Sequence, residues 1–571
     1  MAHPLRVPPL RRAMRELDRT QFARRVPLVA LRVPAAKANK AMKALDSHLL
    51  NWPRLRNLID DPNSPPKGTP PTKLMLLKAD VTARADPAKV PTELPQVVKA
   101  LSDLELPVEA VPYTLELGYE YWSADEILKA VLPEDAEVIT AFEAVGDVAH
   151  MNLRSHLLPY KNLIGQVIVD KNLRINTVVN KTSSIHTQFR TFPLEILARR
   201  ADVETNHTAT HLPTTVSENG ITFHLDFATV YWNSRLHTEH GRLVKRYFSG
   251  DRPALVADAM CGIGPFALPA AKSQLACVFA NDLNPDSYKW LVHNIGTNAI
   301  PSDAPAPAAT EPKDGEEKFF AMPPPAAGLV RPFNLCAREF VRASVAKLND
   351  EYATVVRPAC LAAAANEELR ARTKERKHKD GAAHRATAER LRNAVAHWDA
   401  LEVKTFEHYV MNLPASALGF LDAFHGLYAE HATTPALRTA LAARRPLVHV
   451  YCFTRAQPST PGETDDMACT RDVQARIEQV LGTPLDAPIA VHRVRLVAPR
   501  KHMCCASFTV PEKVVFGECV AGDIGRELNY DAHDEEELVE REDKRAREPV
   551  EGSSGASPVA KKARVDADAA E

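Results

Sequence analysis

A glycine-rich segment near the middle of the chain has the residue types and spacing of a nucleotide-binding turn. It reads Asp-Ala-Met-Cys-Gly-Ile-Gly-Pro-Phe-Ala over residues 258–267 and follows a run of apolar residues. Gly262 and Gly264 fit the G-x-G-x-x-G/A spacing, and Asp282 lies 20 residues beyond Gly262. An acid at that distance binds a ribose diol. The spacing alone therefore predicts a ligand that contains a ribose, such as a dinucleotide.

Two residues in this segment argue against a dinucleotide. Asp258 lies just ahead of the glycines, where a carboxylate attracts a cationic methionine and repels a pyrophosphate. Pro265 removes an N–H group from the start of the next helix, where it would cradle a phosphate. S-adenosylmethionine has a ribose and a positive sulfonium but no phosphate. The turn therefore favours S-adenosylmethionine, the alternative being a glycine turn that binds no ligand.

A second turn offers an amide to a nucleobase. Asn412-Leu-Pro414 follows a strand-like run and resembles the Asn/Asp-Pro-Pro-Tyr turn of enzymes that methylate amines and bases. A fixed Asn side chain there can accept a hydrogen bond from an exocyclic amine. Asn-Pro turns are common, so this signal gains its weight from the matching glycine turn.

Strand-like and helical runs alternate around these turns. The strand-like runs cover residues 254–258, 276–282, 408–412 and 446–453. Such alternation is typical of an open parallel sheet with helices on both faces. Two late runs, 490–497 and 503–510, are only five residues apart, so they must form an antiparallel hairpin. The predicted fold class is α/β, a Rossmann-like class I methyltransferase sheet with a C-terminal antiparallel hairpin.

Two smaller α+β domains are predicted ahead of this sheet. The predicted organisation is an N-terminal domain at 1–132, a middle domain at 133–248, a methyltransferase domain at 249–525 with insertions at 301–332 and 370–392, and a disordered acidic tail at 526–571. The first insertion is rich in proline. The second is basic and helical, and the sequence favours a solvated helix over an RNA-binding arm for it.

Composition excludes several classes of protein. The chain has 571 residues, of which 45% are hydrophobic and 25% charged, so it can bury real cores. No stretch reaches the roughly 20 apolar residues that a membrane-spanning helix needs. Nine cysteines without a CxxC pair argue against a disulfide scaffold and a cysteine metal site, so we expect no metal. Residues 531–571 carry 7 Lys+Arg against 13 Asp+Glu, which leaves a modestly basic body that fits a nucleic-acid partner.

Both ends of the chain carry features of targeting segments. In residues 1–34 the basic residues precede the first acidic residue, Glu16, as in a mitochondrial transit peptide. The alternative is that residues 14–31 already belong to the first domain. The basic cluster at 558–565 either directs nuclear entry or is simply part of a solvated tail. We expect the protein in the cytoplasm, the mitochondrial matrix and the nucleus.

Taken together, these motifs resemble the tRNA (guanine-37-N1)-methyltransferases of the archaeal and eukaryotic type. The resemblance rests on Gly146-Asp-Val-Ala-His-Met-Asn-Leu153, Ile168-Val-Asp-Lys171, Phe189-Arg-Thr-Phe-Pro-Leu-Glu195, Asn233-Ser-Arg-Leu-His-Thr-Glu-His240, the segment 258–266, Asn412-Leu-Pro414 and Val497-Ala-Pro-Arg-Lys-His-Met503. It covers most of 136–511, more loosely the first domain, and neither the insertions nor the tail.

The resemblance implies an activity and a set of partners. It implies methyl transfer from S-adenosylmethionine to N1 of guanine 37 in tRNA, beside the anticodon. That modification supports reading-frame maintenance and begins wybutosine synthesis in phenylalanine tRNA. It further implies a monomer that binds tRNA with guanine at position 37 and no membrane. The alternatives are another tRNA base-modifying transferase of the wybutosine pathway and a non-catalytic tRNA-binding factor.

The resemblance also assigns site residues. The catalytic residues fall on Glu239, Arg190 and Asn412. The cofactor contacts fall on His240, Asp282, Leu283, Cys336, Ala337 and Asn412, in addition to Asp258, Gly262 and Gly264 of the glycine turn. Cys336 is a departure, because the family usually has an Asp there beside the adenine. The cofactor affinity is therefore in question.

The chemistry of the reaction suits these residue types. Guanine N1 carries a proton at neutral pH, and a carboxylate such as Glu239 can remove it as a general base. Negative charge then moves onto O6, where the guanidinium of Arg190 would stabilise it. Without the family, Glu239 would be expected to pair with Arg235 one turn earlier, and Arg190 to be an ordinary surface residue.

Overall fold

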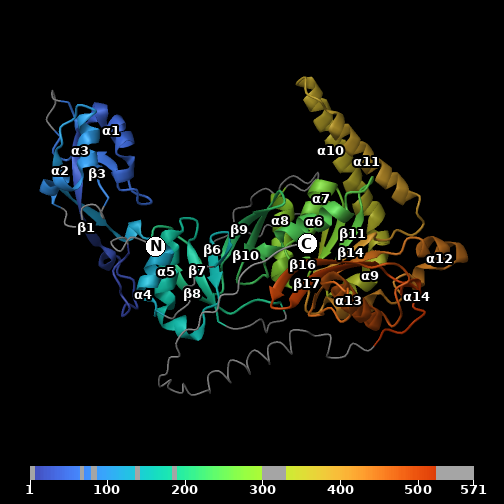
Figure 1. Cartoon of the computed structure of the whole chain (residues 1–571). Coiled ribbons are helices and arrows are strands. Elements are labelled where there is room, and N and C mark those ends of the chain that lie inside the picture. Colours follow the sequence, from blue (N-terminus) through green and yellow to red (C-terminus); the bar gives the residue numbers. More distant parts are fainter. Residues whose placement is uncertain are drawn as a thin grey trace, which may run out of the picture. The chain divides into compact units, whose positions relative to one another are not determined.

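The fold was analysed in a computed structural model of the whole chain, which describes residues 7–64, 70–78, 86–134, 142–182, 189–298 and 329–522 (Figure 1). The predicted acidic tail at 526–571, with its basic cluster at 558–565, lies outside these residues. The chain divides into two compact units. The first comprises 1–253, 261–335 and 354–396, and the second 254–260, 336–353 and 397–571.

The N-terminal part is built on one long strand that serves two cores. Strand β1 (Arg24–Pro34) pairs antiparallel with β3 (Thr72–Leu76) and β4 (Ala110–Leu117), in a sheet of order β2-β3-β1-β4 with β2 at Leu58–Asp60. Because successive side chains of a strand point to opposite faces, Val29 and Leu31 enter one core while Leu28 and Ala30 enter the other. Helices α1 (Ala38–Ala44), α2 (Val90–Glu93) and α3 (Pro95–Ser102) belong to the first of these cores.

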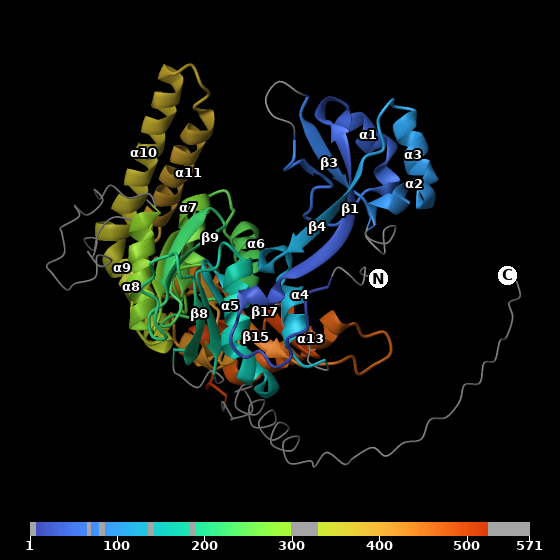
Figure 2. The same cartoon turned by 90° about the vertical axis from the view of Figure 1, so that its left-hand side faces the viewer.

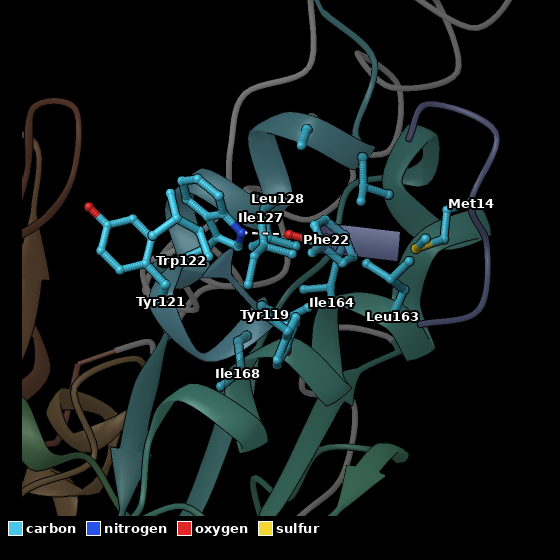
Figure 3. Close-up of a cluster of buried hydrophobic side chains, with 14 of the residues drawn as sticks. Met14, Phe22, Tyr119, Tyr121, Trp122, Ile127, Leu128, Leu163, Ile164 and Ile168 are labelled. Atoms are coloured by element: carbon cyan, nitrogen blue, oxygen red, sulfur yellow. Dashed lines mark hydrogen bonds between the residues drawn. The ribbon is translucent and has the colours of Figure 1, made fainter. Parts of the chain in front are cut away.

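The second core joins the predicted N-terminal and middle domains. It contains α4 (Ala124–Val131), α5 (Lys161–Lys171) and residues of the sheet β5-β6-β7-β8, together with Phe22 and Trp122. Figure 3 shows the indole N–H of Trp122 donating to the carbonyl of Phe22 at 2.8 Å. The predicted boundary at 132/133 therefore does not separate two cores.

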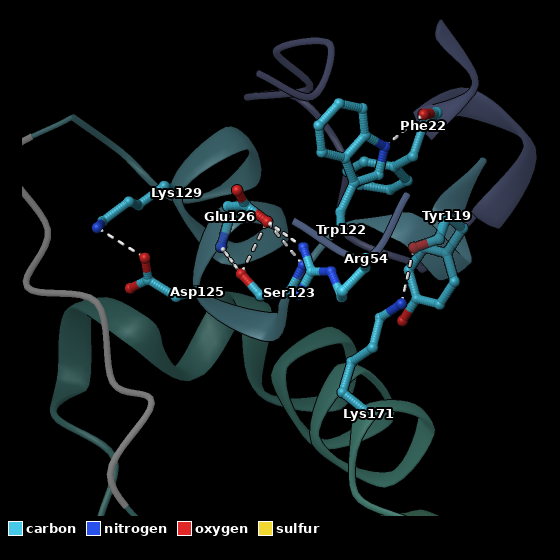
Figure 4. A network of polar contacts seen from close by, with 9 residues as sticks. All are labelled: Phe22, Arg54, Tyr119, Trp122, Ser123, Asp125, Glu126, Lys129 and Lys171. Carbon is cyan, nitrogen blue, oxygen red and sulfur yellow. Dashed lines mark hydrogen bonds and ion pairs between the residues drawn. The ribbon is translucent and has the colours of Figure 1, made fainter. Parts of the chain in front are cut away.

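Polar contacts fix the start of α4 within this joint core. Ser123 and Glu126 form a reciprocal capping box, and Arg54 donates to the Glu126 carboxylate at 3.3 Å (Figure 4). Lys171 of α5 donates to the carbonyl of Tyr119 at 2.7 Å. The four-stranded sheet of this part has β5 at Glu143–Val145, β6 at Val148–Met151, β7 at Thr177–Lys181 and β8 at Leu194–Arg199.

A mixed seven-stranded sheet carries the glycine turn. Its order is β13-β12-β11-β14-β15-β17-β16. The strands are β11 (Leu255–Asp258), β12 (Cys277–Asn281), β13 (Val330–Phe333), β14 (His408–Met411), β15 (Leu447–Thr454), β16 (Ala490–Ala498) and β17 (Lys501–Thr509). Pairs β12/β13, β11/β14 and β14/β15 are parallel, whereas β15/β17 and β16/β17 are antiparallel. The predicted parallel sheet with a terminal hairpin is confirmed.

Helices connect these strands as the alternation predicts. They are α7 (Ala267–Gln274), α8 (Pro285–Thr297), α9 (Ala337–Glu351), α12 (Pro435–Ala442) and α13 (Asp465–Leu481), with α14 (Glu512–Val515) near the end. A hairpin of β9 (Pro213–Glu218) and β10 (Ile221–Asp226), followed by α6 (His237–Tyr247), precedes the sheet. No described helix is long and apolar enough to cross a membrane.

The two predicted insertions have different outcomes. Most of the first, 301–328, lies outside the described residues, and its predicted end at 332 is wrong because residues 330–333 form β13. The many prolines before residue 330 made the strand pattern of β13 hard to recognise in the sequence. β13 is an edge strand, where a proline such as Pro332 is tolerated. The second insertion, 370–392, lies in a pair of helices, α10 (Arg357–Arg376) and α11 (Ala382–Asp399).

Candidate active site

The glycine segment forms the predicted strand–turn–helix. Gly262 and Gly264 have φ of +55° and +100°, where a side chain is strained, and Gly264 N–H donates to the carbonyl of Cys261 at 2.9 Å. A Cβ at Gly264 would lie 2.8 Å from Leu268 Cγ, so that glycine is needed for packing. A Cβ at Gly262 would meet no protein atom within 4 Å. Gly262 thus borders open space, which fits a turn that keeps room for a ligand.

Asp282 is held against this turn, as the spacing predicts. One carboxylate oxygen, Oδ2, accepts the N–H of Gly262 at 2.8 Å, and Oδ1 accepts the N–H of Asn284 at 2.9 Å. Burial raises the pKa of Asp282, and these two hydrogen bonds oppose that shift. The Ser287 side chain also donates to this carboxylate, which offers about four acceptor positions, so one position remains for a ribose hydroxyl.

Leu283 follows Asp282 and presents an apolar side chain that is 42% exposed. The amide of Asn334 donates to the carbonyls of Asp282 and Leu283, at 2.8 and 3.1 Å. The backbone of the Asp282–Leu283 step is thereby fixed while the Leu283 side chain stays accessible. That arrangement suits contact with a flat ring.

The second unit places Asp258 and Asn412 at the ends of two paired strands. Asp258, at the end of β11, is fully buried, and Asn412 follows β14 directly. Within the described part of the chain, the buried Oδ1 atom of Asn412 accepts no hydrogen bond. A buried amide oxygen without a donor is costly. An amine on a bound base or cofactor would satisfy it.

Cys336 and Ala337 begin helix α9. Cys336 is the N-cap residue, but its side chain makes no capping hydrogen bond, and its carbonyl accepts the N–H of Phe340 at 2.9 Å. Ala337 is 7% exposed. An Asp at position 336 would supply the missing cap as well as an acceptor for an adenine amine. The departure from the family pattern therefore removes two interactions at once.

Glu239 lies in the first turn of α6 and is 4% exposed. Arg242 forms a bidentate ion pair with the Glu239 carboxylate: Nε donates to Oε2 at 2.5 Å and Nη2 donates to Oε1 at 2.7 Å. The expected partner, Arg235, instead pairs with Glu143. The alternative pairing of Glu239 with Arg235 is therefore wrong. Arg235 lies in the turn that precedes α6, so the helical i,i+4 geometry does not hold between them.

His240 connects α6 to the glycine segment. Its ring packs edge-to-face on Phe266, with ring centres 4.7 Å apart, and Phe266 directly precedes α7. Its Nδ1 forms a short hydrogen bond with Glu218. Both Glu218 and His240 are buried. The structure thus brings the helix that carries Glu239 against the segment that carries Gly262 and Gly264.

Glu218 is a site residue that the sequence did not predict. It ends β9, and Asn219 and Gly220 follow with φ of +48° and +76°. The pair Asn-Gly is a strong signal for a two-residue hairpin turn. That signal predicts the turn, but it does not predict that the adjacent Glu is buried beside His240.

Arg190 is half-buried and has φ of +58°, a left-handed conformation that is unusual for a residue with a long side chain. It is the second described residue after a gap at 183–188. Strain of this kind is found where a side chain must point in a particular direction.

Among the described residues, no group of three or more His, Cys, Asp or Glu side chains is arranged to hold a metal ion.

Comparison with known proteins places this chain in a family. Residues 124–198 match the TYW2 N-terminal domain, and residues 214–362 match the TRM5/TYW2 methyltransferase domain. A tRNA (guanine(37)-N(1))-methyltransferase of Batrachochytrium dendrobatidis is 36% identical over 515 residues, which are 90% of this chain and 92% of that protein. The enzyme of the same name from Schizosaccharomyces pombe is 37% identical over 536 residues, 91% of this chain and 99% of that protein.

A solved complex of aTrm5 and a leucine tRNA aligns with 85% of this chain and 100% of its own, with a TM-score of 0.46 and 16% identity. Identity above 30% over nearly the whole of both chains leaves no doubt about kinship. The chain belongs to the family of tRNA (guanine(37)-N(1))-methyltransferases, which are S-adenosylmethionine-dependent enzymes.

Proposed function

We propose that this protein transfers a methyl group from S-adenosylmethionine to N1 of guanine 37 in tRNA. The observation that carries the proposal is the placement of Glu239. Its buried carboxylate is oriented by Arg242, and the adjacent His240 packs on Phe266 of the glycine segment. A carboxylate so fixed, next to a turn built for a ribose-containing cofactor, is suited to remove a proton from a bound base.

The residues present fit S-adenosylmethionine. Gly262 leaves open space at the turn, and the oriented carboxylate of Asp282 can accept a ribose hydroxyl. Leu283 offers an exposed apolar side chain for the adenine, and the start of α9 offers the backbone N–H of Ala337. When bound, the cofactor supplies an electrophilic methyl group on a positive sulfur.

The chain's own residues handle the proton and the charge on the base. Glu239 accepts the N1 proton, so that the ring nitrogen can act as a nucleophile. The electron density that this leaves on O6 is stabilised by Arg190. Asn412 holds the base through its Oδ1 atom, which has no donor among the residues that the structure describes. The base has to leave its stack to reach these groups, as in other enzymes that modify bases.

The proposed partner is tRNA with guanine at position 37, bound by a monomeric protein. The modestly basic body outside the acidic tail supports a nucleic-acid partner. We further propose that the protein acts in the cytoplasm, the nucleus and the mitochondrial matrix. Fusing residues 1–35 to a fluorescent reporter tests the mitochondrial part. A reporter that stays outside mitochondria would contradict it.

Transfer to matched tRNA transcripts tests the proposed function. Transcripts that carry G or A at position 37 are incubated with cofactor labelled either on the methyl carbon or on the methionine carboxyl carbon. We expect label only from the methyl group and only with G37. Label from the carboxyl carbon would instead show transfer of the 3-amino-3-carboxypropyl group, by cleavage of a different carbon–sulfur bond of the sulfonium. The match to the TRM5/TYW2 domain does not distinguish these two outcomes, which is why both labels are needed.

A further inference from the structure

Helices α10 and α11 form a hairpin that lies largely beyond the matched methyltransferase domain, which ends at residue 362. Figure 2 shows the two helices running side by side. With 20 residues at about 1.5 Å each, α10 is about 30 Å long. The hairpin therefore carries its connecting turn, residues 377–381, well away from its base.

Buried side chains and polar contacts hold the hairpin together. The contact between the helices is made of buried small and apolar side chains, among them Ala363, Ala364, Ala371, Ala388, Leu391 and Ala394. At the turn, a Cβ on Gly381 would lie 2.8 Å from the carbonyl oxygen of Ala371, so only glycine permits this approach. Arg390 donates to the carbonyl of Gly250 at 2.8 Å. A hairpin packed and anchored in this way holds its turn in a fixed position.

Three glutamates of α10 are paired within the hairpin. Glu367 pairs with Arg370 and His384, and Glu375 pairs with Arg385. Glu368 lies 3.3 Å from the guanidinium of Arg392, and Asp380 accepts the N–H of Ala382 at the start of α11. Asp380 is the one carboxylate that lies in the turn 377–381, so the exposed cations at the turn outnumber the acidic side chains beside them.

Four cations gather at that turn. Lys374, Arg376, Lys377 and Lys379 are all exposed, and none has an ion pair among the described residues. The N–H of Lys379 donates to the carbonyl of Lys374 at 2.9 Å, and His378 has φ of +53°. This reversal ends the helix, and the four cations lie within six successive residues, 374–379, here named the basic tip.

Helix stabilisation accounts for only part of the basic tip. Cations in the last turn of a helix interact favourably with its dipole, which explains Lys374 and Arg376. Lys379 lies beyond the end of α10, where the dipole effect falls away. Four like charges within one turn also repel one another. An anionic partner removes that repulsion.

We propose that the basic tip binds the phosphate backbone of the tRNA substrate. The proposal rests on the proposed function for the identity of the RNA, and it replaces the solvated helix that the sequence favours for 370–392. Lysine and arginine side chains bind phosphates independently of sequence and release counterions as they do so. The basic tip would thus add affinity for tRNA at a distance from the methylated base, without taking part in the transfer step.

The test compares three full-length proteins. The neutral variant carries Lys374→Gln, Arg376→Gln, Lys377→Gln and Lys379→Gln. The matched control carries Lys374→Arg, Lys377→Arg and Lys379→Arg, which keeps every charge. The affinity for a G37 tRNA transcript is measured by filter binding over a series of salt concentrations, and single-turnover methylation is measured at saturating tRNA. Thermal unfolding checks that all three proteins are folded.

We expect the neutral variant to bind tRNA roughly 10- to 100-fold more weakly at about 0.1 M salt, with a salt slope smaller by about 2–3. The control should bind like the wild type, and the saturated rate should be the same in all three. Equal affinity and an equal salt slope in the neutral variant would overturn the proposal. If the wild type binds tRNA but does not methylate it, the proposed function fails while the binding comparison still decides the role of the basic tip.

Discussion

The guanidinium of Arg242 grips both carboxylate oxygens of Glu239 from one turn further along helix α6. The Glu239 side chain is 4% exposed and the Arg242 side chain 25% exposed, so the ion pair is largely shielded from solvent. A forked contact of this kind fixes the orientation of a carboxylate more strictly than a single hydrogen bond does. We regard Arg242 as a positioning residue for Glu239. Glu218 of β9 contacts His240, the residue next to Glu239 on α6, through a single hydrogen bond.

The left-handed conformation of Arg190 allows its side chain to be tested apart from its backbone. Arg190→Gly removes the guanidinium from a position with φ of +58°, which glycine adopts without strain. We expect the free energy of unfolding to change by less than about 1 kcal/mol, and single-turnover methylation to fall by roughly 10- to 10³-fold. Arg190→Lys, which keeps the charge but loses the planar fork, should fall within the same range. A Gly variant that methylates at the wild-type rate would show that Arg190 has no role at O6.

Changing each glycine of the turn to alanine should affect a different property: protein stability for Gly264 and cofactor binding for Gly262. Gly264→Ala places a Cβ against Leu268, so we expect a loss of stability of about 2–4 kcal/mol. Gly262→Ala meets no protein atom and should cost only the backbone strain of about 1–2 kcal/mol. Its methyl group nevertheless enters the space assigned to the cofactor. Calorimetry with S-adenosylhomocysteine should therefore show at least about 10-fold weaker binding for Gly262→Ala, and wild-type affinity would place the cofactor elsewhere.

Restoring an acid at the start of α9 should have two separable effects. Cys336→Asp supplies the missing N-cap of α9, which we expect to stabilise the protein by about 0.5–2 kcal/mol. It also restores a charge-assisted hydrogen bond to the adenine, worth about 1.5–3 kcal/mol in cofactor affinity. Cys336→Ser is the matched control, because serine caps a helix without adding charge. If Asp and Ser tighten S-adenosylhomocysteine binding equally in calorimetry, the charge at position 336 makes no contact with the cofactor.

Two buried histidines should make the protein sensitive to acid. Burial, helped by the positive charges of Lys181 and Arg235, lowers the pKa of His150 to about 3, and burial lowers the pKa of His408 to about 4. Unfolded histidine titrates near pH 6.5. Below that pH the unfolded chain binds more protons, so the free energy of unfolding falls as the pH drops towards 4. Each group should contribute about 2 kcal/mol of loss between pH 6.5 and 5.

The variant His150→Phe isolates one of these groups. The phenyl ring keeps the stacking on Phe227, where the ring centres are 4.9 Å apart, but it cannot titrate beside Glu143. Urea unfolding at pH 7 and pH 5 should show a loss of stability in the variant that is smaller by about 2 kcal/mol. An identical loss in the variant and the wild type would contradict the assignment.

The sequence predicts those parts of the site that depend on local pattern. Strand, glycine turn and helix follow one another within 258–274, and the acid 20 residues after Gly262 reaches back to its N–H group. Spacing suffices here because parallel strands bring their carboxyl ends to one edge of a sheet. The terminal hairpin is predictable for a similar reason, since a short connection leaves only antiparallel pairing.

Other parts of the site and of the fold depend on which of several possible partners a side chain contacts in the folded protein. In the sequence, Arg235 precedes Glu239 by four residues and Arg242 follows it by three, so both are possible partners. Arg235 lies in the 3-10 turn before α6, whereas Arg242 lies in the same α-helix as Glu239 and pairs with it. Glu143, which takes Arg235, is remote in sequence. Likewise, no local pattern indicates that β1 would divide its side chains between two cores. Tertiary packing decides these features.

Single-turnover methylation by Glu239→Gln tests the central claim most directly. A G37 transcript is methylated at saturating protein and cofactor, and the modified position is read by a block to primer extension, because a methyl group on N1 prevents base pairing. Glu143→Gln, which breaks the neighbouring ion pair with Arg235, serves as the control. We predict a block at position 37 for the wild type, a near-normal rate for the control, and a rate lowered by roughly 10²- to 10⁴-fold for Glu239→Gln with unchanged tRNA and cofactor affinities. A Glu239→Gln rate within a few-fold of the wild type, or a wild-type block at another position, would contradict the account.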